Sequence, residues 1–213
     1  MKNELTCLHD KYSIIYVDPP WLYAEKCVYT KKSFFQASDH YDTVVNSDMC
    51  QWDIASLATT NSICYMWATS PKLPEAIELM AAWGFTYKTI AFVWVKTYSE
   101  KCPKHVLGLG SYTRSNVELL LLGTKGKPLP RTEARNTMQQ VVEAPRERHS
   151  AKPKLFAQKI VDLHGDLPRI ELFCRGAAEA GWDATGNECA TNCMLLQDFI
   201  TEKKGKKVWT KNN

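Results

Sequence analysis

The chain has 213 residues, of which 45% are hydrophobic and 23% are charged, with a formal net charge of +4. This composition is ordinary for a globular domain with a sizeable core, and it excludes a disordered or fibrous chain. No apolar run approaches the roughly 20 residues of a membrane-spanning helix, and the N-terminus lacks an apolar signal core. We therefore predict one cytoplasmic domain over residues 1–213, without membrane contact, whose mildly basic charge is compatible with a polyanionic partner.

The eight cysteines do not form a metal-binding pattern, because no two of them are spaced as C-x-x-C. Cys189 and Cys193 are four residues apart, but no second pair of ligands accompanies them. Several cysteines lie inside apolar runs, where a reduced thiol behaves as a small hydrophobic side chain. We expect reduced thiols and no metal ion.

The first predicted element is a buried parallel strand at 13–17, which runs directly into Asp18-Pro19-Pro20-Trp21. The prolines stop the strand and make a rigid elbow, because neither has an N–H to donate. A carboxylate and a backbone carbonyl there can accept both N–H bonds of a base's exocyclic amine, while the indole offers a stacking surface. The alternative is a structural turn with Trp21 in the core. Its place after a strand favours a ligand site.

Residues 22–47 show no regular period and mix aromatic side chains such as Tyr23 with lysines. Such a segment suits a lid over a substrate, because aromatic rings stack on bases and lysines meet phosphates. The alternative is a loop whose aromatic side chains pack on the body of the protein.

The next elements alternate between helix and strand, which predicts a mainly parallel sheet covered on both faces. They are a helix at 48–57, a strand at 62–69, a helix at 71–84 and a strand at 86–96. Ser47 or Asp48 is the expected cap of the first helix. The apolar face expected on the second helix consists of Leu73, Ile77, Met80 and Ala81.

A second long loop is predicted at 97–115, where glycines flank polar and basic residues beside the site. A solvated side chain is the alternative for His105 in this loop. The strand predicted at 116–124 begins near Glu118, which is either a strand-end charge facing water or a group of the site.

The C-terminal third contains a basic arm at 125–139, a short strand at 140–143 and a helix that opens at Lys152-Pro153 and runs to about 163. A lysine beside a helix N-terminus makes a place for an anion, although a surface lysine is the alternative. A strand at 169–174 ends at Arg175, again where ligands bind in α/β folds. A helix at 189–203 and a basic tail follow the predicted core at about 12–188.

Six short blocks occur in an order that resembles the MT-A family of N6-adenine methyltransferases over residues 12–188. They are Asp18-Pro19-Pro20-Trp21, Glu118-Leu119-Leu120-Leu121-Leu122-Gly123, His149-Ser150-Ala151-Lys152-Pro153, Ile170-Glu171-Leu172-Phe173-Cys174-Arg175, Gly181-Trp182 and Gly186-Asn187-Glu188. The resemblance implies an α/β fold of the Rossmann-like class I S-adenosylmethionine-dependent methyltransferases, with a doubly wound, mostly parallel sheet. The motif order is permuted, since the catalytic motif precedes the cofactor motif, and we expect a terminal antiparallel strand.

The resemblance also implies roles for individual residues. The catalytic residues would be Asp18, Pro19, Pro20 and Trp21. The S-adenosylmethionine contacts would be Asp18, Lys152, Phe173, Arg175, Asn187 and Glu188. The substrate contacts would be Trp21, Tyr23, Lys104, His105, Tyr112, Arg114 and Glu118.

The activity implied by the resemblance is methyl transfer from S-adenosylmethionine to the N6 amino group of adenine in nucleic acid, leaving S-adenosylhomocysteine and using no metal. DNA is the favoured substrate, and RNA is the alternative. Two other interpretations are an inactive nucleic-acid-binding subunit of the same fold and methylation of a protein glutamine amine. A homodimer is compatible with all of them.

Overall fold

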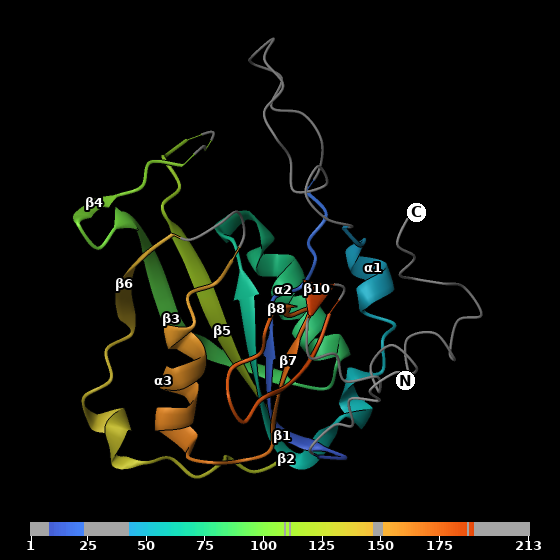
Figure 1. Ribbon diagram of the computed structural model, residues 1–213. Helices are drawn as coiled ribbons and strands as arrows, with labels where there is room; N and C mark the ends of the chain where they lie inside the picture. The colour runs from blue at the N-terminus through green and yellow to red at the C-terminus, as the bar shows by residue number, and fades with distance from the viewer. Residues whose placement is uncertain are drawn as a thin grey trace, which may run out of the picture.

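The computed structural model describes residues 9–23, 43–108, 110, 112–146, 151–186 and 188–189. Within them, an eight-stranded sheet has the order β4-β3-β5-β2-β1-β7-β9, with β6 beside β3 (Figure 1). Its strands are β1 Tyr12–Val17, β2 Ala58–Ala68, β3 Thr86–Ser99, β4 Cys102–His105, β5 Val117–Lys125, β6 Val141–Pro145, β7 Arg169–Leu172 and β9 Asp183–Thr185. A separate parallel pair joins β8 Arg175–Gly176 to β10 Glu188–Cys189.

Most strands of this sheet run in one direction. β1 lies inside the sheet and is parallel to β2 on one side and to β7 on the other. β7 is parallel to β9, and β3 is parallel to β6. Because β5 is antiparallel to both β2 and β3, these two neighbours also point the same way as β1. The expectation of a mostly parallel α/β sheet is confirmed.

The expected terminal antiparallel strand is β4, which lies at the end of the strand order and is antiparallel to β3, while a second antiparallel strand, β5, was not expected. The antiparallel strand β5 lies inside the sheet, between β3 and β2. A parallel neighbour needs a crossover connection, usually a helix, and the described part of 100–116 contains none. The chain instead turns back through the antiparallel strand β4 and then enters β5, so the predicted loop at 97–115 includes a hairpin.

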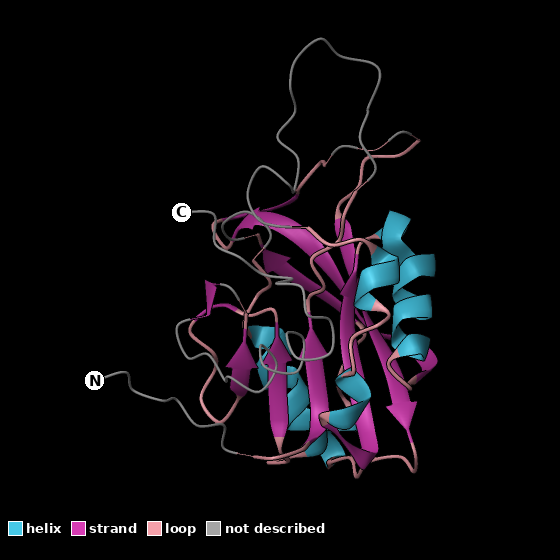
Figure 2. Ribbon diagram, turned by 90° about the vertical axis from the view of Figure 1, so that its right-hand side faces the viewer, coloured by secondary structure: helices cyan, strands magenta, loops and turns pink. Residues whose placement is uncertain are grey.

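The two faces of the sheet are buried under different helices, α2 Leu73–Ala82 and α3 Leu155–His164. Figure 2 shows the strands between these helical layers. The side chains of β1 alternate between the two cores: Ile15 and Val17 join the cluster beneath α2, while Ile14 and Tyr16 join the cluster beneath α3. This alternation explains why 14–17 is apolar throughout, since both of its faces are covered.

Gly123 allows α2 to approach the sheet closely. A Cβ built at this position of β5 would lie 2.2 Å from Sδ of Met80 on α2. A larger residue would force the side chain of Met80 to move, so packing against α2, and not a turn, favours glycine here.

The helices differ in detail from the predicted ones. The stretch 48–57 contains two short helices, α1 Asn46–Met49 and the 3-10 helix η2 Ile54–Ser56. Asp53 between them has φ −83° and ψ 59°, and the Ile54 N–H bonds to the Trp52 carbonyl at 2.9 Å, which interrupts the helix. The predicted side-chain cap is also wrong, since Val45 caps α1 without a side-chain hydrogen bond.

The two longer helices begin later than predicted. A 3-10 turn, η3 Ser70–Lys72, precedes α2, whose buried residues are Ala76, Leu79 and Met80. Leu73 and Ile77 pack only partly against the core, so the predicted face was rotated. The helix α3 starts at Leu155, and the basic arm before it contains the 3-10 helix η4 Glu133–Asn136.

The predicted C-terminal helix at 189–203 falls almost wholly outside the described residues, and its first residue, Cys189, belongs to β10. None of the described helices is both long and apolar enough to cross a membrane.

Candidate active site

The elbow leaves β1 at the end of the sheet where β2 and β7 also end. Trp21 N–H bonds to the Pro19 carbonyl at 2.8 Å, and Val44 N–H bonds to the Pro20 carbonyl at 2.9 Å. These bonds close the turn, which the two prolines have already made rigid. The Pro19 carbonyl retains a second lone pair, since an amide oxygen accepts two hydrogen bonds. The turn therefore still offers an acceptor beside the Asp18 carboxylate.

Trp21 lies in the core, as expected if the elbow is a structural turn. Its side chain is 4% exposed, and its indole N–H bonds to the carbonyl of Trp67 at 3.2 Å. The ring also lines a small slot next to Asp18 and Tyr23. Trp21 thus serves the core and forms one wall of the slot.

A chain of buried charges starts at Asp18. Its Oδ2 lies 2.7 Å from Nζ of Lys152, and the same Nζ lies 3.3 Å from Oε2 of Glu118. The other oxygen of Glu118 pairs with Lys96 of β3. Two lysines and two carboxylates therefore alternate, and their charges balance in a region of restricted solvent access.

This arrangement affects the two carboxylates differently. Burial raises the pKa of Asp18 above its usual value, although the ammonium of Lys152 opposes the shift. Burial also acts against ionisation of Glu118, but Lys152 and Lys96 together hold the pKa of Glu118 below its usual value. The charge of Asp18 therefore depends on one lysine, Lys152, whereas the charge of Glu118 is supported by two.

Two cavities meet at Lys152. The larger has a volume of about 280 Å³, near the lower end of the range for small-molecule sites (roughly 300–1,000 Å³). The second is the slot beside Trp21, with a volume of about 20 Å³, which is room for about one water molecule. Asp18, Lys152 and Trp67 line both, so these side chains form the wall between them.

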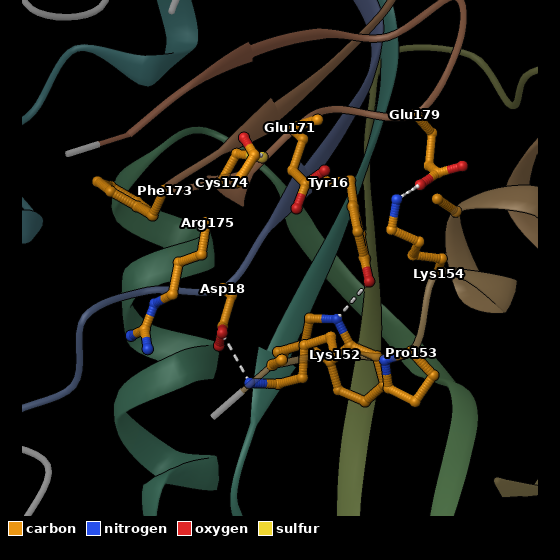
Figure 3. A pocket seen from close by; sticks show the side chains of 15 residues that line it. Tyr16, Asp18, Lys152, Pro153, Lys154, Glu171, Phe173, Cys174, Arg175 and Glu179 are labelled. Atoms are coloured by element: carbon orange, nitrogen blue, oxygen red, sulfur yellow. Dashed lines mark hydrogen bonds and ion pairs between the residues drawn. The ribbon is translucent and has the colours of Figure 1, made fainter. Parts of the chain in front are cut away.

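The larger cavity is lined by acidic and basic side chains that lie next to one another, as Figure 3 shows. Asp18 directly follows β1, and Glu171 lies in the neighbouring strand β7. Lys152 comes from the segment between β6 and α3, and Arg175 from β8. Burial, together with the charge of Asp18, raises the pKa of Glu171 to about 7. The carboxyl of Glu171 would therefore gain from a positive charge placed in this cavity.

The backbone turns sharply at the end of β7. Phe173 has φ +62°, a left-handed conformation that is uncommon for an aromatic residue. Its ring packs against Trp52 with 5.5 Å between the centroids, which keeps it in place. This turn directs the chain from β7 into β8, so that Cys174 and Arg175 also line the cavity. Strained backbone of this kind often marks a functional site.

The structure brings most of the predicted cofactor residues together. Asp18, Lys152, Phe173 and Arg175 all line the larger cavity. Lys152 precedes α3 instead of lying in its first turn, and its ammonium faces two carboxylates rather than the helix end. Asn187 lies outside the described residues, so its role stays a prediction. Of Glu188 only its place in β10 is described, where it is paired with Arg175 of β8.

The predicted substrate residues separate into two groups. Glu118, Trp21 and Tyr23 line the slot, and the Tyr23 hydroxyl is 2.9 Å from that of Thr69. The other four line neither cavity and are exposed. They are Lys104, His105, Tyr112 and Arg114.

The four exposed residues lie on the protein surface. His105 pairs with Glu143 at 3.1 Å on the surface of the hairpin, in agreement with the solvated alternative. Tyr112 is fully exposed. Because these residues line neither cavity, their role in binding a longer substrate stays a prediction. Of the lid predicted at 22–47, residues 24–42 lie outside the described residues, so the lid stays a prediction.

Four residues of the site were missed by sequence reasoning. They are Tyr16, Trp67, Lys96 and Glu171. Tyr16 accepts a hydrogen bond at 2.7 Å from the indole of Trp67, which fixes both rings beside the cavity. Glu171 carried a usable signal, because it is a charged residue inside an otherwise apolar strand that ends at a candidate site. The described residues contain no group of three or more acidic, histidine or cysteine side chains that could hold a metal ion.

A mostly parallel sheet with a carboxylate elbow at the end of an inner strand, next to a cavity lined by acidic and basic side chains, fits an α/β methyltransferase fold. The chain belongs to the MT-A70 family, whose model matches residues 12–188. This membership confirms the family resemblance drawn from the six blocks.

Two relatives illustrate the range of this similarity. The chain is 37% identical over 210 residues to the type II methyltransferase M.MunI of Mycoplasma sp, covering 91% of this chain and 85% of M.MunI. It is 26% identical over 181 residues to a protein of Oryza sativa subsp. japonica named as an N(6)-adenosine-methyltransferase, MT-A70-like. That match covers 84% of this chain but only 23% of the plant protein.

Proposed function

We propose that this protein transfers a methyl group from S-adenosylmethionine to the N6 amino group of adenine in DNA. The observation that carries the proposal is the position of Asp18, whose carboxylate stands in the wall shared by the larger cavity and the slot. A side chain in this wall can contact a ligand in either cavity. In methyl transfer the donor sulfur and the acceptor nitrogen lie in line on opposite sides of the methyl carbon, so cofactor and base must occupy adjoining spaces.

The larger cavity fits S-adenosylmethionine in its chemistry. When bound, this cofactor supplies a methyl group on a positively charged sulfur. Asp18 and Glu171 provide negative charge for that sulfur or the cofactor's amino group, and Lys152 and Arg175 provide positive charge for its carboxylate. Asn187 and Glu188 are proposed to bind the ribose.

The slot would receive the adenine amino group. The Asp18 carboxylate and the Pro19 carbonyl accept its two N–H bonds, which favours the pyramidal nitrogen needed for attack on the methyl group. The ammonium of Lys152 already donates to Asp18 and Glu118, which supports the view that these carboxylates accept N–H donors at this place. A slot of about 20 Å³ is too small for a purine, so the walls must move apart when the base enters.

We favour DNA over RNA because the similarity to the type II methyltransferase M.MunI extends over 85% of that protein's length. The relative named for N6-adenosine is covered over 23%. A target inside a duplex would have to be flipped out of the stack, at a cost of a few kcal/mol. The protein would act in the compartment that holds this DNA, which we take to be the cytoplasm.

The test is to incubate the protein with isotope-labelled S-adenosylmethionine and, separately, with unmethylated DNA, RNA and a protein mixture. Mass analysis of the resulting nucleosides and peptides should show labelled N6-methyladenine from DNA. Label in RNA alone, or on glutamine, would contradict the proposed substrate. A thermal shift with S-adenosylmethionine but no transfer to any acceptor would favour an inactive subunit.

The matched variants are Asp18→Asn and Asp162→Asn. Both replace a carboxylate by an amide of the same shape, and Asp162 is exposed near the far end of α3. The first should abolish transfer without unfolding the protein, and the second should leave transfer unchanged. Near-normal turnover of the Asp18 variant would refute the proposed role of the elbow.

A further inference from the structure

An exposed aromatic side chain and an arginine lie together at the end of β3, outside both cavities. Tyr98 is 46% exposed, and the guanidinium carbon of Arg146 lies 5.4 Å from the centroid of its ring. Arg146 directly follows β6, and its backbone N–H bonds to the Thr97 carbonyl at 2.9 Å. Two neighbouring strands therefore hold the pair in register.

Strand alternation places Tyr98 on the same face of the sheet as the active-site charges. Trp94, Lys96 and Tyr98 are spaced by two residues on β3, so their side chains share one face. Trp94 belongs to the core beneath α3, and Lys96 reaches Glu118 from this face. Lys152, which also contacts Glu118, lies before α3 on the same side.

The same argument applies to Arg146. Val142 and Ala144 of β6 pack into the core beneath α3, and Arg146 continues this series. The carboxylate of β6, Glu143, alternates with them and points to the opposite face, where it pairs with His105 at 3.1 Å. The acidic residue of β6, Glu143, therefore does not pair with the exposed Arg146.

The pair also lies at a useful distance from the target. The contacts from Asp18 through Lys152 and Glu118 to Lys96 cross the sheet from β1 to β3. β2 and β5 lie between these strands, so the separation is three strand spacings, or roughly 14 Å. That length corresponds to about four stacked nucleotides of one strand.

We propose that Tyr98 and Arg146 form a subsite for a nucleotide about four positions away from the target adenine in the same strand. The ring of Tyr98 stacks on the base, and Arg146 binds the adjacent phosphate. Stacking on an aromatic ring accepts any base, and a guanidinium binds phosphate oxygens through paired N–H groups. This subsite rests on the proposed function and extends it, because it gives the nucleic acid a contact outside the reacting centre.

The test measures binding of a fluorescein-labelled, mixed-sequence DNA by anisotropy, as single strand and as duplex, with S-adenosylhomocysteine present. Tyr98→Ala should weaken binding of the single strand roughly 5- to 150-fold, the range for loss of one base–aromatic stack. Arg146→Ala should weaken binding and lower the slope of log affinity against log salt by about 1. Arg135→Ala, an exposed arginine of η4, serves as the control and should change neither value.

Two conservative variants test whether a loss of binding comes from misfolding. Tyr98→Phe keeps the aromatic ring and should bind the DNA as the wild type does. Arg146→Lys keeps the charge and should keep the slope of log affinity against log salt. Unchanged affinity and salt slope in both alanine variants would overturn the subsite. So would unchanged DNA binding with an altered sedimentation coefficient, which would assign the pair to a protein contact. Methyl transfer is measured separately on the same DNA, so its absence in the wild type refutes the proposed function while the binding data still decide the subsite.

Discussion

The ammonium of Lys152 lies 2.7 Å from the carboxylate of Asp18, although 134 residues separate the two in the chain. The same ammonium lies 3.3 Å from Glu118 and 5.7 Å from the centre of the Trp67 ring. Lys152 therefore favours the charged form of Asp18, the carboxylate that we propose binds the acceptor amine. If that proposal holds, the amine must share or displace this ammonium, which couples entry of the base to the charge of Asp18.

Replacing Lys152 by methionine should remove the ammonium that pairs with Asp18 and Glu118, without opening a large cavity. Asp18 and Glu118 would then face each other without their shared counter-ion, and the pKa of Asp18 would rise further. We expect methyl transfer to fall by at least about 100-fold, since a carboxylate that becomes protonated no longer stabilises the reacting amine, and loss of one preorganised electrostatic group costs roughly 10²–10³ in rate. Single-turnover rates measure this, with the exposed Lys127→Met as the control. A variant that retains more than a tenth of the wild-type rate would contradict the role assigned to Lys152.

The pH dependence of methyl transfer should reflect Asp18. Only the ionised carboxylate accepts both an ammonium and an amine, and burial raises its folded pKa above 3.8. Activity should therefore be full above the folded pKa and fall as the pH drops through it, at a pH higher than for an exposed aspartate. The profile of kcat/KM between pH 4.5 and 8 measures this, within limits set by folding. A profile that is flat down to the acid unfolding transition would contradict it.

Glu171→Gln should stabilise the ligand-free protein at alkaline pH. The pKa of Glu171 is raised from 4.5 to about 7, so the folded state retains a proton that the unfolded chain loses between these values. Wild-type stability therefore declines as the pH rises from 4.5 to 7, by up to about 3 kcal/mol. The amide carries no charge and avoids this loss.

Urea unfolding at pH 5 and pH 8 compares the two proteins. The midpoint of the variant should exceed that of the wild type at pH 8 by more than it does at pH 5. The variant should also bind S-adenosylmethionine more weakly, because the cavity loses its negative partner. Equal pH dependence of the two midpoints would show that Glu171 ionises normally.

Trp21→Phe tests whether the indole contributes to the core. The change removes the hydrogen bond from the indole to the Trp67 carbonyl and leaves that side of the buried slot incompletely filled. We expect the free energy of unfolding to fall by about 2 kcal/mol, from the lost bond and the lost packing. Thermal or urea unfolding measures this loss, and Trp52→Phe gives a comparison, because its buried indole N–H has no hydrogen-bond partner in the described structure. Equal losses in the two variants would mean that the hydrogen bond of Trp21 adds nothing.

Short-range patterns accounted for much of the fold. The strand predicted at 13–17 is β1, the strand predicted at 62–69 overlaps β2, and the strand predicted at 86–96 lies within β3. These predictions succeeded because strands buried on both faces are apolar over their whole length. The rotated face of α2 shows where this reasoning fails, since the sheet beneath a helix, and not its periodicity alone, decides which residues are buried.

The sequence by itself determined the elbow and the family, because prolines, an aspartate and an ordered set of motifs are local and need no partners. Only the tertiary structure decided that β5 runs antiparallel within the sheet, that Lys152 joins Asp18 to Glu118, and that Trp21 faces the core. It also placed Tyr98 beside Arg146, 48 residues further along the chain. These relationships depend on strand order and register, which bring together residues that no local pattern connects.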